Sequence, residues 1–343
     1  MVDAVAVSGA VSGATPGDTL GASPGSPARP GPAEPGRAED GAGSAARRVG
    51  TRTRRRTVGG GHGPAALPYV QASPLALILG AFLLVPLGML VVVSFFDYDS
   101  VRIIPDFVWT NYREVLGSAV TWRTYANTLK YAVLVWAITL LVGFPVAYFL
   151  AFHVRSVAVQ TALFLACTVP FLTSNIIRMI SWVPFLGREG LVNSALMRAG
   201  VVDRPLDALL FSDFAVVLAF VHLYTLFMVV PIFNAMTRID RRLIEAAVDA
   251  GAGPWAVVRE VVVPLCKPGI AIGSVFVLTL VMGDFITVRL MGGGQRASVG
   301  LMISNQISLL QYPAACANAV VLLAVVLLMI GAVLRVVDIR KEL

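Results

Sequence analysis

Residues 240–264 read DRRLIEAAVDAGAGPWAVVREVVVP, a polar segment that stands between two long apolar stretches. Asp240 is placed to cap a helix that opens at Arg241, because its carboxylate can accept from the free backbone N–H groups of the first turn. Gly251 follows where a left-handed residue commonly ends a helix, and Pro254 suits the first turn of a second helix. The segment therefore predicts two short helices that meet at a glycine elbow.

The first of these helices is expected to offer small side chains to another protein. Leu243, Ala246 and Ala247 lie at i, i+3 and i+4 and so share one helical face. Alanine and glycine side chains at this place would let a second surface approach the backbone closely. The alternative is an ordinary helical hairpin between two membrane spans.

The composition is that of a membrane protein. The chain of 343 residues is 57% apolar and 14% charged, so it is more apolar and less charged than soluble domains. Several stretches can each supply the roughly 20 apolar residues of a membrane-spanning helix. They are residues 74–96, 127–152, 159–182, 214–235, 270–290 and 316–336. We therefore expect an all-α polytopic membrane protein with six transmembrane helices.

Basic residues set the expected orientation in the membrane. An arginine cluster stands shortly before the first apolar stretch, and Lys and Arg hold such a flank in the cytoplasm. The cluster consists of Arg47, Arg48, Arg52, Arg54, Arg55 and Arg56. The N-terminus is therefore expected inside, and six crossings return Arg335, Arg340 and Lys341 at the C-terminus to the same side. Residues 238–269 are then cytoplasmic as well.

Residues 1–68 are rich in Gly, Pro, Ala and Ser and are expected to form a disordered cytoplasmic tail. Such a composition buries too little apolar surface to offset the entropy lost on ordering. The tail is not a secretory signal, because the apolar stretch after it is too long and lacks an obvious cleavage site. Two interpretations of its role stay open: the tail binds anionic lipid through its arginines, or it has no role. A third alternative is that the start codon has been placed too far upstream, so that the tail is not part of the protein.

Polar residues interrupt the third apolar stretch. Pro170 is followed by Thr173, Ser174, Asn175 and Arg178. A helix broken in this way is tolerated in lipid only where protein or a water-filled cavity covers the freed backbone groups. We therefore expect this span to face a solute pathway, with Asn175 and Arg178 as candidate pathway residues.

Asp284 places a carboxylate inside the fifth stretch. A rise of about 1.5 Å per residue from residue 270 puts it roughly 21 Å from the cytoplasmic edge, within a hydrocarbon core about 30 Å thick. An unpaired carboxylate that faces lipid costs several kcal/mol, so Asp284 is expected to face the pathway or a neighbouring span. Two interpretations stay open: a structural ion pair with Arg178, or a pathway carboxylate that helps a cationic solute to pass.

The sequence gives little support to catalysis or metal binding by this chain. We find no GxxxxGK[ST] phosphate loop, GxSxG elbow or HExxH pair. Cys167, Cys266 and Cys316 are scattered, and their spacing fits neither a disulfide framework nor a metal site. We therefore expect a chain that is not an enzyme by itself, with no cofactor and no metal, and its basic residues do not indicate a nucleic-acid partner.

Two classes of membrane protein find little support in the sequence. A secondary transporter would need broken helices at corresponding positions of two halves, and only the third stretch is clearly broken in the sequence. A membrane-embedded enzyme would have to be built from Asp284, Arg178 and His222, which lie on three different spans without a nucleophile. Both interpretations are therefore weak.

The segment described first also resembles the EAA loop of the permease subunits of ABC importers. That family's pattern is EAA, three residues, Gly, nine residues and Ile-x-Leu-Pro, and here valines replace the Ile and the Leu. The matching residues are Glu245, Ala246, Ala247, Gly251, Val261, Val263 and Pro264. In the family this loop is gripped by a cytoplasmic ATPase. The resemblance therefore implies that Glu245, Ala246, Ala247, Gly251 and Pro264 couple the chain to an ATPase.

Further stretches resemble the permeases of the spermidine and putrescine importer family. They are GFPVAY at 143–148, PFLTSNIIR at 170–178, GREGLVN at 187–193, GDFIT at 283–287 and NQI at 305–307. This resemblance implies a type I importer architecture, a second similar permease, two ATPase copies and an extracytoplasmic solute-binding protein. It also implies alternating access in a bacterial plasma membrane, with a polyamine as the solute and another small solute as the alternative.

Overall fold

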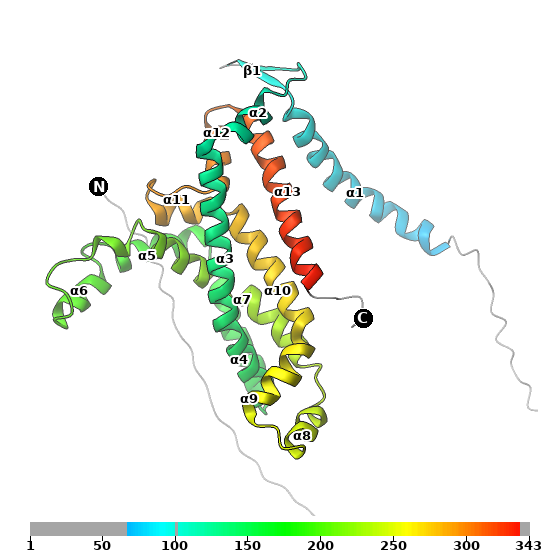
Figure 1. Cartoon of the computed structure of the whole chain (residues 1–343), viewed down its shortest axis with the longest axis vertical. Helices are drawn as coiled ribbons and strands as arrows, with labels where there is room; N and C mark the ends of the chain where they lie inside the picture. Colours follow the sequence, from blue (N-terminus) through cyan, green and yellow to red (C-terminus); the bar gives the residue numbers. More distant parts are fainter. Residues whose placement is uncertain (1–66, 100–101, 337–343) are drawn as a thin grey trace, which may run out of the picture. The chain divides into compact units, whose positions relative to one another are not determined.

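The computed structural model describes residues 67–99 and 102–336, which are helical apart from one short hairpin (Figure 1). Within these residues, five helices are long and apolar enough to cross a membrane. They are α1 (Leu67–Val93), α3 (Ala119–Tyr148) with a π-helical turn (Phe149–His153), α7 (Asp213–Met236), α10 (Val263–Gly283) with the helical segment before it, and α13 (Tyr312–Val336). The helical membrane architecture is confirmed, but six continuous spans are not.

Shorter elements connect these helices. They are β1 (Asp97–Asp99) and β2 (Arg102–Ile104), α2 (Thr110–Gly117), α4 (Val157–Thr168), α5 (Asn175–Leu186), α6 (Leu191–Arg198), α8 (Arg241–Asp249), α9 (Pro254–Val257), α11 (Ile286–Gly292) and α12 (Val299–Ser308). Helix α1 begins at Leu67, so the last two residues of the expected tail belong to this helix. Residues 1–66, on which the expected disorder falls, lie outside the described residues.

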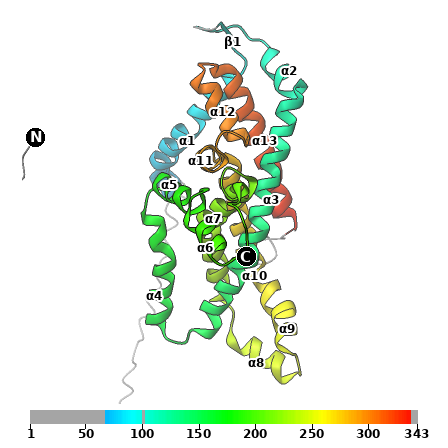
Figure 2. The ribbon, with the colours of Figure 1, turned by 90° about the vertical axis from the view of Figure 1, so that its left-hand side faces the viewer.

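The core forms around α7, which packs against both α3 and α10 (Figure 2). A Cβ atom at Gly269 of α10 would lie 2.6 Å from the carbonyl oxygen of Pro231 and 2.7 Å from Cβ of Ala235, both on α7. At Gly273 a Cβ would lie 2.8 Å from Sδ of Met228, which is fully buried. These glycines let the backbones of α7 and α10 approach more closely than larger residues would permit.

The third expected span is broken where the polar residues stand. Helix α4 ends at Thr168, a 3₁₀ turn covers Val169–Leu172, and α5 starts after Ser174. Neither α4 nor α5 is long enough to qualify as a membrane span. The expected interruption is therefore confirmed, and a continuous span over 159–182 is wrong, because Pro170 removes a backbone donor within the stretch.

The fifth expected span is broken as well. Helix α10 ends at Gly283, Asp284 has extended backbone angles, and α11 starts at Ile286. This is a second break, so the expectation that only the third span is broken is wrong. Helix α11, which follows the second break, contacts α5, which follows the first. At its other end the helical segment reaches back to Pro254 rather than residue 270, through α9 and a π-helical turn (Val258–Val262).

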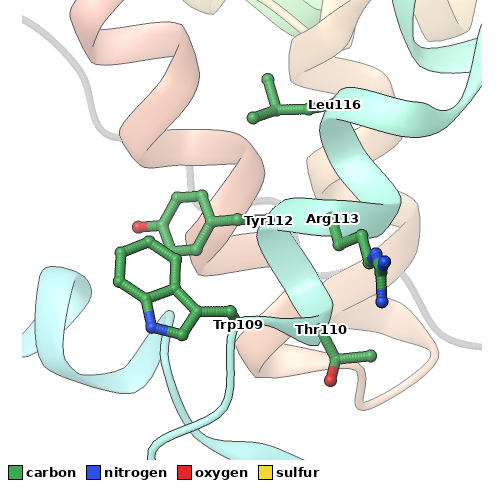
Figure 3. A pocket seen from close by; sticks show the side chains of 5 residues that line it. All are labelled: Trp109, Thr110, Tyr112, Arg113 and Leu116. Carbon is green, nitrogen blue, oxygen red and sulfur yellow. The ribbon is translucent and has the colours of Figure 1, made fainter.

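The connection between α1 and α3 is folded rather than open. Asn111 of α2 donates to the carbonyl oxygens of Ser94 and Phe96, at 3.1 and 2.8 Å. The hydroxyl of Tyr112 lies 2.7 Å from Oγ of Ser94. A pocket of about 460 Å³ forms along α2 (Figure 3), and its lining residues are Trp109, Thr110, Tyr112, Arg113 and Leu116. These contacts fasten α2 to the end of α1.

Candidate functional site

The two helices predicted from residues 240–264 are present as α8 and α9, and local interactions define the start and the end of α8 and the start of α9. Oδ1 of Asp240 accepts from the backbone N–H of Arg242 at 3.0 Å, which caps α8. Gly251 has φ +88°, and the backbone N–H of the following Ala252 donates to the carbonyl of Ala247 at 3.0 Å. This is the left-handed helix ending that favours glycine. Pro254 then occupies the first turn of α9, as expected.

Helix α8 has an apolar face of which only part is covered. Ile244 and Ala247 pack against the core, whereas Leu243 and Val248 are 50% and 55% exposed. Glu245 and Ala246 are exposed too. Glu245 and Ala246 of the EAA pattern therefore remain accessible to a partner, whereas Ala247 is partly covered by the core.

The second half of the pattern lies where the chain turns from α9 into α10. Val262 is fully buried in the π-helical turn, and Pro264 is half-buried in the first turn of α10. Trp255, one turn beyond the elbow, is 75% exposed. Trp255 was not among the residues expected from the sequence, although an isolated tryptophan in a polar loop is a signal that could have found it.

Asp284 is held by neutral groups. The hydroxyl of Tyr224 on α7 donates to its Oδ2 at 2.7 Å, and the hydroxyl of Thr287 donates to the same oxygen at 2.8 Å. The backbone N–H of Thr287 donates to Oδ1 at 2.9 Å, so the carboxylate caps α11. Among the ion pairs between described residues, none joins Asp284 to Arg178. The structural pair considered from the sequence is wrong, because Asp284 bridges α7 and α11 instead.

Arg178 lies one helical turn after Asn175 on α5 and points into a different environment. Its Nη2 donates to the carbonyl of Thr173 at 3.3 Å, and its guanidinium carbon lies 5.3 Å from the centre of the Phe171 ring. Its Nε and Nη1 are buried and have no hydrogen-bond partner among the described residues. With Trp182 and His222 it lines a cavity of about 260 Å³.

His222 is explained by packing between helices. Its Nδ1 accepts from Nε1 of Trp182 at 3.1 Å, which connects α7 to α5. Within residues 67–99 and 102–336, no three His, Cys, Asp or Glu side chains lie together so that they could hold a metal ion. His222 thus acts as an interhelical hydrogen-bond acceptor that helps to hold α5, the helix that carries Arg178, against α7.

A second polar cluster joins α3, the start of α7 and the loop between α11 and α12. Asp213 accepts from Nζ of Lys130 at 2.6 Å and from the hydroxyl of Tyr131 at 2.6 Å. Nε of Arg296, in the loop between α11 and α12, lies 3.2 Å from the same carboxylate. The charged side chains are 40% to 48% exposed, so this cluster is half in solvent. The sequence analysis did not anticipate it.

Comparison with known proteins assigns the family. Residues 64–339 match the family described as binding-protein-dependent transport system inner membrane component. The chain belongs to this family. Its members are membrane permease subunits of ABC transporters, so this chain is a transport subunit of the inner membrane and not an enzyme.

Relatives of this permease are named for different solutes. The chain is 30% identical to the spermidine/putrescine transport system permease protein PotB of Escherichia coli (strain K12), over 73% of this chain and 90% of PotB. It is 27% identical to the osmoprotective compounds uptake permease protein GgtC of Synechocystis sp. (strain ATCC 27184 / PCC 6803 / Kazusa), over 75% and 94%. The family assignment therefore leaves the solute open.

A solved structure shares the fold of this permease. It is a chain of a bacterial alginate ABC transporter in complex with alginate pentasaccharide-bound periplasmic protein. The TM-score is 0.61 at 19% identity, and the match covers 78% of this chain and 92% of that chain. At this identity the similarity supports the ABC permease fold alone.

Proposed function

We propose that the chain is a permease subunit of an ATP-driven ABC importer in which α8 and α9 couple the solute pathway to a cytoplasmic ATPase. The observation that carries this proposal is the capped glycine elbow with its uncovered apolar face. Leu243, Val248 and Trp255 are each at least half exposed beside Gly251. Exposed apolar groups gathered on one loop indicate a protein interface.

The depth of Trp255 supports a protein partner over a membrane contact. Lys267 stands twelve residues further along the same helical segment, and a lysine near a helix end keeps its ammonium group at the membrane surface. Twelve residues correspond to roughly 18 Å of helix. The headgroup layer extends only about 5–7 Å beyond the hydrocarbon core. Trp255 therefore reaches past the lipid headgroups into the cytoplasm, where an ATPase would cover it.

The complete importer would contain two copies of the ATPase, a second homologous permease and an extracytoplasmic solute-binding protein. The matching family is binding-protein-dependent, and the alginate transporter was solved with its periplasmic protein. Closure of the ATPase dimer on ATP would move α8 and α9, and with them α10, whose far end carries the break at Asp284. Both chain termini would be cytoplasmic in this arrangement.

We infer a polyamine such as spermidine or putrescine as the solute. PotB, which is named for these two polyamines, is identical to this chain at 30% of the aligned residues over most of both chains. The alternative is another small solute, as the osmoprotective compounds of GgtC indicate. Asn175, Arg178 and Asp284 are the proposed pathway residues, since they border the two broken helices.

Reconstitution tests the proposal directly. The chain, its second permease and its ATPase would be placed in proteoliposomes with the solute-binding protein outside, and uptake of labelled putrescine would be measured with and without ATP. We expect uptake that requires ATP and the binding protein. Failure of the ATPase to associate with the permease would refute the coupling role, and ATP-driven uptake of a different solute would refute the polyamine.

A further inference from the structure

A cavity of about 290 Å³ lies where the two broken helices meet α7. Its lining comes from the start of α5, from α7, from the end of α10 and from the residues before α11. The lining residues are Asn175, Tyr224, Thr279, Leu280, Gly283, Asp284, Phe285 and Ile286. The contacts of α11 with both α5 and α7 hold these elements together (Figure 1).

This cavity combines hydrogen-bond acceptors with aromatic rings. Oδ1 of Asn175 is buried and has no hydrogen-bond partner among the described residues. The carboxylate of Asp284 receives its hydrogen bonds from neutral donors, two hydroxyl groups and one backbone N–H. Its negative charge is therefore not balanced by an ion pair with another described residue. The rings of Tyr224 and Phe285 form part of the wall.

This combination selects one kind of ligand. A primary ammonium group has three donors and no acceptor, so it satisfies an unpartnered amide oxygen and a carboxylate together. The aromatic face of Tyr224 adds attraction for a cation, whereas the ring of Phe285 already has the guanidinium carbon of Arg289 5.8 Å from its centre. A neutral hydroxyl would leave the carboxylate charge unbalanced within the membrane, which is unfavourable. A metal ion lacks support, because no group of three ligating residues occurs among the described residues.

Arg178 does not close this cavity. Its guanidinium is stacked on Phe171 and lines the neighbouring cavity with Ser181, Trp182 and His222. The two cavities therefore carry opposite charges, one helical turn apart along α5. A solute ammonium group is attracted to the Asp284 side and repelled from the Arg178 side.

We propose that Asn175, Tyr224 and Asp284 form a binding site for a primary ammonium group on the translocation pathway. The proposal rests on the proposed function for the presence of a pathway, and it assigns the solute class, an amine, to a particular cavity. Oδ1 of Asn175 and the Asp284 carboxylate accept from the ammonium group, and the Tyr224 hydroxyl orients the carboxylate.

Charge-selective labelling tests the site without relying on transport. Thr279 lines the cavity and is exposed, so Thr279→Cys is a reporter that leaves the three proposed residues in place. The three native cysteines of the chain would first be replaced. The reporter would be studied in the complete complex in nanodiscs, with the cationic reagent methanethiosulfonate ethylammonium and the anionic reagent methanethiosulfonate ethylsulfonate. Leu309→Cys, at a 68% exposed position just after α12 with no charged residue within four positions along the chain, normalises the intrinsic rates of the reagents.

We expect the normalised rate to favour the cationic reagent roughly tenfold or more, because a unit charge within about 10 Å at an effective dielectric constant near 20 is worth that much. Asp284→Asn keeps the cap of α11 and should abolish most of the preference. Asp203→Asn, which removes a charge from an exposed loop, should leave it unchanged. Putrescine should slow the labelling, and 1,4-butanediol, of the same length but uncharged, should not.

Two outcomes would overturn the site. One is an unchanged preference in Asp284→Asn in a complex that retains its ATPase activity; the other is equal protection by putrescine and 1,4-butanediol. Asn175→Leu serves as the second variant, since it removes the free acceptor without touching the α11 cap, and it should weaken protection by putrescine. If charge preference and protection persist while ATP-driven putrescine uptake is absent, the ammonium site stands and the polyamine assignment of the proposed function fails.

Discussion

Gly251 at the elbow between α8 and α9 allows the effects of strain, size and charge to be separated. Its φ of +88° is one that L residues rarely adopt, and a Cβ added there would meet no atom within 4 Å among the described residues other than its two chain neighbours. The cost within the permease is therefore backbone strain alone, about 1–2 kcal/mol. That strain shifts the elbow away from its observed form by about 5- to 30-fold, and it leaves the packed core of α3, α7 and α10 untouched.

Three substitutions divide this effect. Gly251→Ala introduces the strain with little bulk, and Gly251→Asn adds bulk but tolerates the left-handed conformation. Gly251→Asp adds a side chain of nearly the same size as Asn that also carries a negative charge. If an ATPase covers the elbow, Gly251→Asp buries an unpaired charge at that interface, which costs more than the strain does. We expect transport to be reduced in Gly251→Ala, reduced less in Gly251→Asn and abolished in Gly251→Asp.

The assay combines three measurements on each variant: membrane abundance, co-purification of the ATPase and ATP-driven uptake in proteoliposomes. Membrane abundance should stay near that of the wild-type protein in all three variants, because no contact within the chain is lost. Wild-type uptake by Gly251→Asp would refute the assignment of this elbow to an interface. A loss of abundance that parallels the loss of uptake would show that the effect arises in folding.

Three further changes test other parts of the molecule. Trp255→Ala should weaken ATPase association about 30-fold, which is the effect of an interface residue worth about 2 kcal/mol. Trp109→Ala, at a 72% exposed position just before α2, should leave the association unchanged, and a pull-down titration measures both. Gly269→Val should lower the unfolding midpoint by overpacking the α7–α10 contact at about 1–3 kcal/mol, whereas Gly88→Ala, with no atom within 4 Å, should have little effect in the same thermal unfolding assay. Asp213→Asn should remove about 1 kcal/mol of half-exposed ion pairing, and the difference from wild type should shrink as salt is raised.

The coupling loop could be predicted from the sequence because short-range interactions determine it. The Asp240 cap, the left-handed Gly251 and the proline at the start of α9 each act within a few residues of the chain. The same holds for the break near Pro170, where a missing backbone donor is evident in the sequence. Trp255 shows the limit of this approach, since its exposure depends on how far the segment that begins at Pro254 extends beyond the membrane.

The break at Asp284 has a local part, the cap on the backbone N–H of Thr287, and a part that sequence patterns do not reveal, the hydroxyl of Tyr224 sixty positions earlier in the chain. Without the Tyr224 hydroxyl, residues 270–290 read as one apolar helix, and the carboxylate then requires a cation such as Arg178. With the hydroxyl at 2.7 Å, the carboxylate instead ends one helix and caps the next. Tertiary hydrogen bonds of this kind determine where a helix stops, and they are invisible to periodicity.

The correction at Asp284 changes what the site can do. An ion pair between Asp284 and Arg178 would have neutralised both groups and left a pathway of low polarity. Because each is held separately by neutral partners, the carboxylate keeps its charge in one cavity and the guanidinium keeps unpartnered donors in the next. Unbalanced charges within a membrane are unfavourable unless they meet water, a partner chain or a passing solute. Their persistence side by side on the two broken helices is therefore best explained by a pathway, and the sign of the charge at Asp284 favours a solute that carries an amine.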